Sequence, residues 1–312
     1  MEYRKLGESG LQVSAVGLGC NNFGRRCDAA QTAAVVGAAL EAGVTLFDTA
    51  DVYGPGGLSE EYLGQALQGK RQGVVLATKF AAPVGDGPYA GGASRRYIFQ
   101  AVEASLRRLG TDHIDLYQVH VPDAKTPIEE TLRALDDLAR AGKVRYAGCS
   151  NFTGWQIADA AWTARAQHLA PFVSAQNLYS LLDRRVEREV IPAAQRFGLG
   201  ILPYFPLASG LLTGKYRRGE AAPEGTRLAA AEMGQRALTD ANFDVVEKLE
   251  PFSRERGHTL LELAVGWLAS NPAVSSVIAG ATRPEQVRAN VEAVGWRLTA
   301  EERAEVDRLT RR

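Results

Sequence analysis

Four polar side chains lie at or just past the ends of three apolar stretches, and their types suit the delivery of a proton. Asp48 lies near the end of the first stretch, Tyr53 lies five residues further on, Lys79 lies in the second stretch, and His120 ends the third. A free phenol is a weak acid with a pKa of about 10, and a nearby ammonium group makes it a better donor. We therefore expect Tyr53 to donate a proton and Lys79 to supply the positive charge beside it.

The other two residues of this set have supporting roles that fit their chemistry. Asp48 would keep Lys79 charged and oriented, and a neutral His120 would donate a hydrogen bond to the oxygen that receives the proton. Each residue alone also has an ordinary explanation, as a cap, a packed ring or a structural histidine. A lysine in a buried strand is harder to explain, because an unpaired buried charge is costly. An alternative role for Lys79 is to form a Schiff base, as lysines do in barrel aldolases. That role leaves the spacing from Asp48 to Tyr53 unexplained.

Apolar stretches of strand length alternate with helical patterns along the whole chain. Each stretch is nearly continuous in apolar residues, which is typical of parallel strands buried on both faces. The predicted strands are residues 16–20, 45–50, 74–80, 113–120, 144–150, 172–179, 200–206 and 274–279. Eight strands alternating with helices predict the α/β fold class and a closed (β/α)8 TIM barrel, whose chemistry lies at the carboxyl ends of the strands. No linker divides the chain, so we expect residues 1–312 to form a single domain.

Two of the helices between these strands have clear signals. Residues 97–109 and residues 127–141 each place apolar side chains on one face, with the spacing of an α-helix. Thr126 precedes Pro127, and Glu129 follows at the position of a capping-box glutamate. We therefore expect Thr126 to cap a helix whose first residue is Pro127.

Four segments lie outside the strand–helix alternation. Residues 3–13 read as a hairpin with a turn at residues 7–10, which would close the bottom of the barrel. An additional C-terminal helix is expected to begin at Thr299 with the same kind of cap. Residues 81–93 and 209–238 are long, glycine-rich and non-periodic, and both follow predicted strands. Loops of that length are usually lids or binding loops.

Composition excludes several classes of partner. Lys and Arg together number 36, as do Asp and Glu, so there is no surplus charge to attract nucleic acid or an anionic membrane. No apolar stretch approaches the ~18 residues of a membrane span, and residues 1–7 lack the apolar core of a signal peptide. The cysteines, Cys20, Cys27 and Cys149, show no metal-ligand spacing. We expect a reduced, cytoplasmic protein without a metal.

Three further segments match one known family. Residues 148–152 read Gly-Cys-Ser-Asn-Phe, residues 174–177 read Ser-Ala-Gln-Asn, and residues 204–216 read Tyr-Phe-Pro-Leu-Ala-Ser-Gly-Leu-Leu-Thr-Gly-Lys-Tyr. Together with the order of the Asp, Tyr, Lys and His, they resemble the aldo-keto reductase family, whose members reduce carbonyl compounds with a nicotinamide cofactor. The resemblance extends over nearly the whole chain.

The resemblance implies a cofactor site along the mouth of the barrel. Ser150, Asn151 and Gln176 would bind the nicotinamide carboxamide, which needs both donors and acceptors. Tyr204 would stack on the nicotinamide ring, and the small residue that the family usually has next is Phe205 here. The pyrophosphate would lie along the following stretch, with Leu207, Ser209, Gly210, Leu211 and Lys215, and Arg227 would add positive charge.

The same resemblance places the adenosine end of the cofactor after the eighth strand, near Gly280. Thr282 and Arg283 would meet the 2′-phosphate of NADP at a helix N-terminus, where anions are favoured. Gln286 and Asn290 would flank the adenine. Sites for NAD tend to place a carboxylate beside the ribose, so the basic residue here favours NADP.

The expected function is therefore reversible reduction of an aldehyde or ketone with NADPH, with Tyr53 as the general acid. General acid catalysis of this kind contributes about 10²- to 10⁴-fold. One alternative is a cofactor-binding regulatory subunit with little turnover, like the relatives of this barrel that attach to ion channels. Sugars, aromatic aldehydes, dicarbonyls and steroids all remain open as substrates, and monomer and homo-oligomer are both open.

Substrate specificity is expected to lie in the loops after the first, third, fourth and seventh strands. Phe23, Phe80, Tyr89 and Phe205 lie in or beside these loops. Each could form an aromatic wall of the substrate pocket, and each could equally pack within its own loop.

Overall fold

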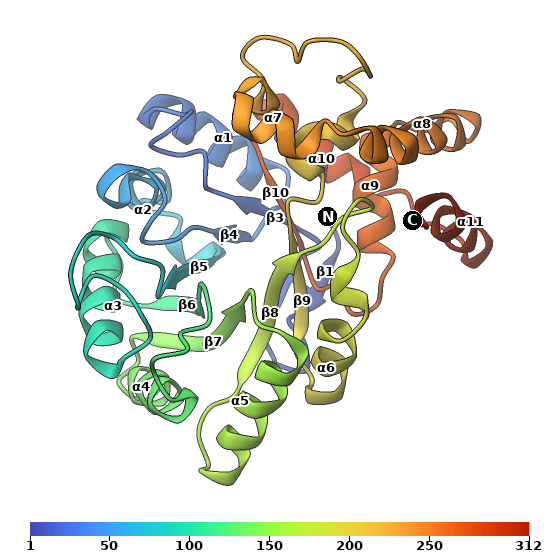
Figure 1. The fold of residues 1–312 in the computed structure, drawn as a ribbon. Helices are drawn as coiled ribbons and strands as arrows, with labels where there is room; N and C mark the ends of the chain where they lie inside the picture. Colours follow the sequence, from blue (N-terminus) through green and yellow to red (C-terminus); the bar gives the residue numbers. More distant parts are fainter. Residues whose placement is uncertain (312) are drawn as a thin grey trace.

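Parallel strands close into a barrel surrounded by helices in the computed structural model, which describes residues 1–311 without the side chain at position 231 (Figure 1). In the order in which they pair around the barrel, the strands are β10 (Val277–Gly280), β3 (Val16–Gly19), β4 (Leu46–Asp48), β5 (Val75–Phe80), β6 (Ile114–Val119), β7 (Val144–Ser150), β8 (Phe172–Leu178) and β9 (Gly200–Tyr204). β9 pairs with β10 and closes the ring. The predicted (β/α)8 barrel is confirmed.

Helices form a ring outside the strands in Figure 1. In chain order they are α1 (Ala29–Glu41), α2 (Leu58–Ala66), α3 (Arg95–Leu109), α4 (Ile128–Arg140), α5 (Gly154–Ala166), α6 (Val190–Phe197), α7 (Ala231–Ala237), α8 (Asp240–Glu255), α9 (Leu260–Ala269), α10 (Pro284–Ala293) and α11 (Ala300–Thr310). Short 3-10 helices are η1 (Pro55–Gly57), η2 (Arg71–Gly73), η3 (Arg185–Glu187), η4 (Ala208–Thr213) and η5 (Arg227–Ala229).

The strands are buried on both faces, as their apolar composition predicts. Every residue of β5 is buried. Ala77 packs with Leu46 and Leu116 in a cluster inside the barrel, whereas Phe80 packs with the larger cluster between the strands and the helices. Because side chains alternate along a strand, Lys79 lies on the same inner side as Ala77, and Thr78 lies on the outer side with Phe80.

The apolar stripe of α3 forms as predicted, and its members Ile98, Val102 and Leu106 are buried. The helix begins two residues before the predicted start, because the side chain of Ser94 caps it by accepting a hydrogen bond from the N–H of Tyr97. The stripe therefore fixes which face of α3 meets the barrel, and the cap fixes where the helix begins.

The cap predicted for α4 is wrong. Thr126 donates its hydroxyl to Asp123 at 2.8 Å, so this side chain is committed to the preceding loop. Pro127 occupies the N-cap position without a side-chain hydrogen bond, and the helix begins at Ile128. The acidic side chain of Glu129 in the first turn still lies where the helix dipole favours a negative charge.

The predicted hairpin closes the bottom of the barrel. β1 (Tyr3–Lys5) and β2 (Gln12–Ser14) pair antiparallel, and Leu6 and Val13 join the cluster inside the barrel. Gly7 has a φ of +58°, and a Cβ there would overlap the backbone of Gly198 and Gly200 at the start of β9. The turn therefore needs glycine both for its conformation and for this close approach.

Both predicted long loops lie at the opposite face, where the strands end. Residues 81–93 join β5 to α3 without a helix or strand. The segment between β9 and α8 contains η4, η5 and α7, so the prediction of a non-periodic loop over residues 209–238 misses these short helices.

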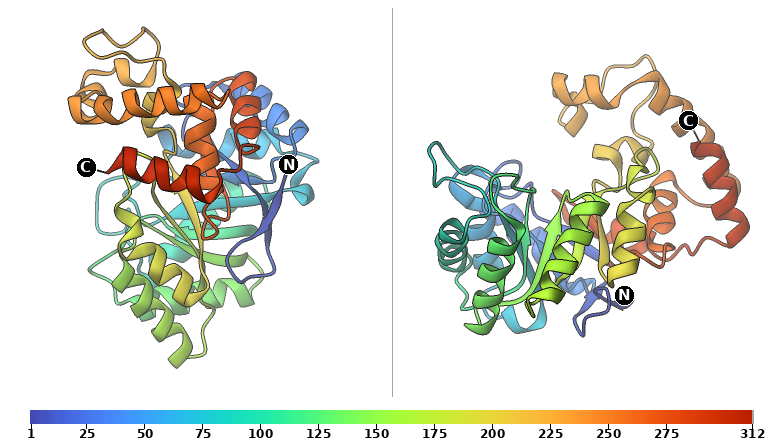
Figure 2. Two further views of the ribbon diagram at one scale, coloured as in Figure 1. Left: turned by 90° about the vertical axis from the view of Figure 1, so that its right-hand side faces the viewer. Right: turned by 60° about the horizontal axis from the view of Figure 1, so that its bottom comes forward.

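The expected C-terminal helix is α11, and it lies beside α8 outside the barrel (Figure 2). Thr299 caps it by accepting a hydrogen bond from the N–H of Glu302, whose carboxylate accepts the N–H of Thr299 in return. Arg256 of α8 forms ion pairs with Glu302 and with Glu305. The capping box predicted at Thr299 is confirmed.

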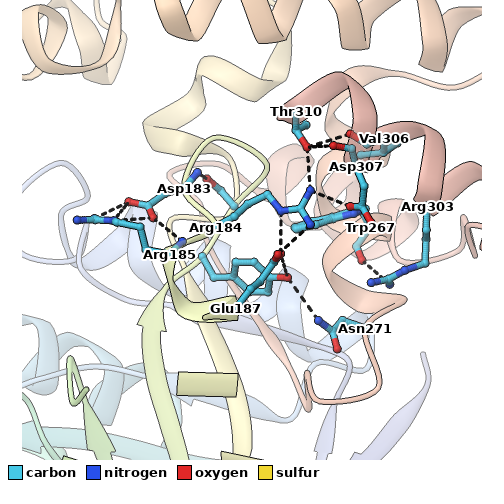
Figure 3. A network of polar contacts seen from close by, with 12 residues as sticks. Asp183, Arg184, Arg185, Glu187, Trp267, Asn271, Arg303, Val306, Asp307 and Thr310 are labelled. Atoms are coloured by element: carbon cyan, nitrogen blue, oxygen red, sulfur yellow. Dashed lines mark hydrogen bonds and ion pairs between the residues drawn. The ribbon is translucent and has the colours of Figure 1, made fainter. Parts of the chain in front are cut away.

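Arg184, in the segment between β8 and α6, connects that segment to the C-terminal helix (Figure 3). Its guanidinium lies 2.8 Å from Glu187, 2.7 Å from Asp307 and 2.8 Å from the hydroxyl of Thr310. It also lies 4.9 Å from the centre of the Trp267 ring, on α9. One side chain therefore holds three elements together on this side of the barrel.

Candidate active site

A cavity of about 880 Å³ opens at the carboxyl ends of the barrel strands. Asp48, Tyr53 and His120 line one part of it, and Arg283 and Asn290 line another. Its volume falls within the roughly 300–1,000 Å³ that is usual for small-molecule sites. Three of the four predicted proton-transfer residues thus share one cavity, and the fourth, Lys79, lies directly behind it.

Lys79 and Asp48 form an ion pair inside the barrel. Nζ of Lys79 lies 2.6 Å from Oδ2 of Asp48 and donates a second hydrogen bond to the carbonyl oxygen of Thr49 at 2.8 Å. Lys79 has no exposed surface and Asp48 is 3% exposed. Burial lowers the pKa of Lys79, but the charges of Asp48 and Tyr53 outweigh burial, so the pKa is raised. The lysine is therefore a permanent buried cation, as the sequence predicts.

Asp48 is also held by two amide side chains. Nε2 of Gln118, on β6, and Nε2 of Gln176, on β8, each donate to Oδ1 of Asp48 at 2.9 Å. Gln118 has no exposed surface. The sequence analysis missed it, although a signal exists: it is an amide in an apolar strand, two residues before His120, and so faces the same side.

Tyr53 lies next to this ion pair, with Nζ of Lys79 5.0 Å from the centre of its ring. Burial raises the pKa of Tyr53 above its usual value, and the charge of Lys79 offsets only part of that rise. The direction expected for the lysine is right, but the net effect in the ligand-free site is a phenol that keeps its proton. A protonated phenol is the form that a general acid needs.

His120 stays neutral. Burial and the charge of Lys79 lower the pKa of His120 to about 3. The imidazole meets the Tyr53 ring edge-on, with ring centres 5.6 Å apart, and its Nδ1 has no hydrogen-bond partner among the described residues. The predicted neutral histidine is therefore consistent with the site, whose cavity His120 lines.

The amide side chains predicted to bind a carboxamide lie at the ends of β7 and β8. Asn151 has a φ of +61°, and its Nδ2 donates to the carbonyl oxygen of His120 at 3.0 Å and to the hydroxyl of Ser150 at 3.1 Å. Tyr204 donates its hydroxyl to Oδ1 of Asn151 at 2.7 Å. These bonds orient Asn151 before any ligand arrives.

Gln176 is satisfied on one side only. Its Nε2 donates to Asp48 and, at 3.4 Å, to Gln118, but its Oε1 accepts no hydrogen bond from residues 1–311. The residue lines the cavity. An acceptor without a donor suits the N–H of a primary amide, so this site fits the carboxamide of a nicotinamide.

The segment after β9 contains a run of left-handed backbone conformations. Phe205, Ala208 and Ser209 have φ values of +53°, +46° and +59°, and Gly210 has +98°. Conformations of this kind cost about 1–3 kcal/mol each outside glycine and cluster at ligand clamps. Phe205, Leu207, Ser209 and Gly210 all line the cavity.

Positive charge lines the cavity beyond this segment. Lys215 and Arg227 both contribute to the lining, and the guanidinium of Arg227 lies 5.0 Å from the centre of the Phe205 ring. Arg26, which the sequence analysis did not single out, also lines the cavity and donates to the carbonyl oxygen of Gly225 at 2.7 Å. That bond joins the loop after β3 to the loop after β9 across the mouth of the barrel.

The predicted adenosine end lies where β10 leads into α10. Gly280, Thr282, Gln286 and Asn290 line the cavity there, and Oε1 of Gln286 accepts the N–H of Thr282 at 2.8 Å. Arg283 is the N-cap residue of α10 and pairs with no carboxylate in the described part of the chain. A free guanidinium at a helix N-terminus suits a phosphate group.

Four expected lining residues lie elsewhere. The side chain of Leu211 is fully buried in the core beneath η4 and does not line the cavity. Phe23 and Phe80 have no exposed surface, because each packs outside the barrel against helices, so neither is an aromatic wall. Tyr89 is exposed and lies against Arg96, with 3.7 Å between the guanidinium carbon and the ring centre. Only Phe205 of the four aromatic candidates faces the cavity.

Comparison with known proteins agrees with this geometry. The profile of the aldo/keto reductase family matches residues 15–311. The chain belongs to that family. A probable voltage-gated potassium channel subunit beta of Arabidopsis thaliana is 39% identical, over 94% of this chain and 91% of the relative. Among the aldo/keto reductases, an aldo-keto reductase of Bacillus subtilis, YhdN, is 37% identical over 99% of this chain and 93% of its own.

A third relative within the family has a named substrate. The L-glyceraldehyde 3-phosphate reductase of Escherichia coli (strain K12) is 33% identical, over 98% of this chain and 92% of the relative. The family therefore includes oxidoreductases and channel subunits that are similar to this aldo/keto reductase over nearly its full length. No helix within residues 1–311 is long and apolar enough to cross a membrane.

Proposed function

We propose that this aldo/keto reductase uses NADPH to reduce an aldehyde or ketone to an alcohol, reversibly. The observation that supports this most is the position of Tyr53 in the cavity, with the buried Lys79–Asp48 pair behind it and a neutral His120 beside it. A phenol, a fixed cation and a neutral hydrogen-bond donor together suit protonation of an oxygen that gains negative charge.

The side chains divide the work as follows. When bound, the reduced nicotinamide supplies a hydride to the carbonyl carbon. His120 orients the carbonyl oxygen, and Tyr53 delivers a proton to that oxygen as the hydride arrives. Lys79 stabilises the phenolate that remains, and Asp48 keeps Lys79 in place through the 2.6 Å ion pair. In the reverse direction the phenolate accepts the proton of the alcohol.

NADP is the proposed form of the cofactor. Gln176 and Asn151 would hold the carboxamide, and Tyr204 would cover one face of the ring. Lys215 and Arg227 would meet the pyrophosphate. Arg283 supports the assignment of a 2′-phosphate, because it is unpaired among the described residues and lies at the start of α10.

The first test is turnover with a small aldehyde panel that includes 4-nitrobenzaldehyde and methylglyoxal. We expect wild-type protein to consume NADPH and Tyr53→Phe to lose at least about 100-fold in kcat, because the general acid is absent. The measurement is loss of the dihydronicotinamide absorbance, together with NADPH binding by fluorescence, which Tyr53→Phe should leave within about 3-fold. Tyr62→Phe, on α2 away from the cavity, is the matched control and should behave like the wild type.

Two results would contradict the proposed roles of Tyr53 and of the protein. If Tyr53→Phe keeps most of the wild-type kcat, another group donates the proton. If the wild type binds NADPH and turns over no aldehyde, the reductase proposal is wrong and the channel-subunit alternative gains support.

Cofactor preference is tested at Arg283. Arg283→Ala should weaken NADPH binding by about 10-fold or more, since a hydrogen bond to a charged group contributes about 1.5–3 kcal/mol, and should change NADH binding little. The readout is the dissociation constant of each cofactor. Arg288→Ala is the control, because Arg288 lies one turn along α10 and faces Glu41 at 3.9 Å. An equal loss for both cofactors would remove the 2′-phosphate contact.

A second function is favoured by the relatives with 39% identity, which are named as probable potassium channel subunits. A protein of that kind would bind NADPH and join a larger assembly through its outer surface. Co-purification with a stable membrane partner, alongside negligible turnover, would favour this function over the reductase.

A further inference from the structure

A second cavity lies outside the barrel wall, behind the proposed proton donor. It has a volume of about 340 Å³, and its lining includes Asp51, Gly57, Val84, Tyr97 and Arg108. These residues come from the turn after β4, from the start of α2, from the loop after β5 and from α3, elements that are neighbours in Figure 1. No residue of this lining belongs to the larger cavity.

Asp51 is buried beside this cavity, and one of its two carboxyl oxygens has no hydrogen-bond partner among the described residues. The residue is 5% exposed. Tyr97 donates its hydroxyl to Oδ2 at 3.2 Å, whereas Oδ1 has no hydrogen-bond partner among the described residues. A buried polar atom without a partner is costly, so the carboxyl group is poorly suited to carry a full negative charge here.

The surrounding charges do not balance that of Asp51. The charge of Arg108 acts on Asp51, but this guanidinium lies 2.6 Å from Glu60, which is itself fully buried. Thr78 donates to the other oxygen of Glu60 at 2.5 Å. Glu60 and Arg108 therefore neutralise each other, and Asp51 would be a second, uncompensated anion.

The titratable groups that face Asp51 come from every element packed around it: Glu60 from α2, Tyr97 and Arg108 from α3, and Tyr117 from β6. Burial raises the pKa of Asp51 to about 7, and the charge of Glu60 adds to this rise. The hydrogen bond from Tyr97 and the charge of Arg108 oppose it. Near neutral pH, Asp51 therefore exists as a mixture of acid and carboxylate.

The backbone of Asp51 is attached directly to the proposed catalytic residues. Its N–H donates to the carbonyl oxygen of Lys79 at 3.2 Å. It is also the second residue of a turn that the N–H of Tyr53 closes on the carbonyl oxygen of Ala50 at 3.1 Å. A displacement of Asp51 therefore moves the backbone that carries Tyr53.

We propose that Asp51 is a positioning residue for Tyr53: as a neutral acid it keeps the turn 50–53 seated against β5, and its ionisation displaces that turn. The proposal rests on the proposed reduction. The neutral acid fits because it adds no charge beside Glu60. The carboxylate repels Glu60 and competes with it for Arg108, and it draws water into the adjoining cavity.

This role predicts a pH dependence that the proposed proton-transfer groups do not supply. The pKa of His120 is lowered to about 3, and the pKa values of Tyr53 and Lys79 are raised. None of these three groups titrates near neutral pH. We expect kcat for reduction to fall by about 10-fold or more between about pH 6 and pH 9 as Asp51 ionises.

The experiment is a pH profile of kcat at saturating NADPH for four proteins. Asp51→Asn cannot ionise and should change by less than about 2-fold over that range. Tyr97→Phe removes a hydrogen bond that favours the carboxylate of Asp51, so kcat of this variant should fall at a higher pH than kcat of the wild type. Asp112→Asn makes the same change at a side chain that is 93% exposed, and it should follow the wild-type profile.

Unfolding supplies a readout that does not depend on turnover. The pKa of Asp51 is raised on folding from about 4 to about 7, so the folded state holds a proton that the unfolded state has lost. The stability that this proton contributes is present below about pH 4 and is lost as the pH rises through 7. Relative to Asp51→Asn, wild type should therefore lose melting temperature between about pH 4 and pH 8.

The outcomes separate this inference from the function on which it rests. A wild-type profile that persists in Asp51→Asn would overturn the inference and leave the reductase intact. If Asp51→Asn does not fold, an unshifted profile in Tyr97→Phe has the same meaning. A melting-temperature difference that is constant with pH would also overturn the inference, and absence of wild-type turnover at every pH would remove the reductase together with this role.

Discussion

The carboxylate of Asp48 accepts hydrogen bonds from side chains on three other strands. They are Lys79 on β5, Gln118 on β6 and Gln176 on β8. In the proposed reaction Lys79 stabilises the phenolate of the proton donor, Tyr53, whereas Gln176 binds the amide of the cofactor. One buried anion therefore contacts both halves of the chemistry, and we expect the loss of one of its donors to loosen its hold on Lys79.

Gln118→Leu tests this arrangement, because leucine has a similar size but is apolar and removes one donor from Asp48. We expect kcat to fall by about 10- to 100-fold, since a hydrogen bond to a charged group contributes about 1.5–3 kcal/mol. NADPH binding should weaken by no more than about 3-fold, because Gln176 keeps its bond to Asp48. Steady-state kinetics and cofactor titration measure the two effects.

Gln195→Leu is the matched control for that variant, because Gln195 is exposed on α6 far from the cavity. It should leave kcat unchanged. If Gln118→Leu also leaves kcat unchanged, Asp48 does not need this donor to hold Lys79.

The sequence predicts the proposed proton-transfer residues because their types are unusual at the ends of buried strands. Lys79 is the clearest case, since a lysine in an apolar strand needs a partner. The sequence does not predict that Gln118 donates to Asp48, because that contact depends on the register between strands 70 residues apart. The pairing of Glu60 with Arg108 leaves Asp51 without a cation among the described residues, and only the packing of α2 on α3 shows this.

At the scale of elements, the sequence predicts where the strands lie along the chain, but it does not predict which of their side chains point into the barrel. Each barrel strand is buried on both sides, so apolar composition does not show which residues face inward. This is why Phe80 could be expected at the pocket although it packs outside the barrel. The predicted start of α4 is wrong for a related reason. The hydroxyl of Thr126 donates to Asp123, and this contact lies within an irregular loop that no periodic pattern predicts.

The packing of α2 on α3 makes a prediction of its own. A Cβ at Gly64, on α2, would meet the backbone of Leu109 within 2.8 Å. Gly64→Ala should lower the free energy of unfolding by about 1–3 kcal/mol, because the helices must separate. Gly37→Ala on α1 is the control, since nothing lies within 4 Å of its Cβ position. That change should raise stability by up to about 1 kcal/mol through helix propensity.

Chemical denaturation of both variants measures the difference. Opposite signs at the two glycines would confirm that the close approach of α2 to α3 determines the effect at Gly64. A stabilising effect at both positions would show that the α2–α3 contact adapts freely, and would weaken the case for a rigid wall around Asp51.

At the scale of the molecule, one side chain from the middle of the chain helps to hold the C-terminal helix, in addition to the ion pairs of Arg256. Arg184 pairs with Glu187 and Asp307 and also donates to Thr310 (Figure 3). Arg184→Met should lower the free energy of unfolding by about 1–2 kcal/mol, because two carboxylates lose their cation but remain partly exposed, so that water screens part of the effect. Amide hydrogen exchange in α11 should become faster in this variant.

Arg185→Met is the matched control, because the neighbouring arginine is 79% exposed and, within residues 1–311, pairs with Asp183 alone. Exposed ion pairs contribute about 0–1 kcal/mol, so this variant should unfold nearly like the wild type. If both variants lose the same stability, the connection through Arg184 does not hold α11.

The position of Arg184 also has a consequence for how the protein is made. Thr310 is added to the growing chain 126 residues after Arg184. At about 5–20 residues per second, the ribosome needs roughly 6 to 25 seconds for that interval. The segment after β8 is therefore synthesised well before α11, the helix that holds it. During translation this segment lacks its contacts with α11 while the last strand of the barrel is still to be made.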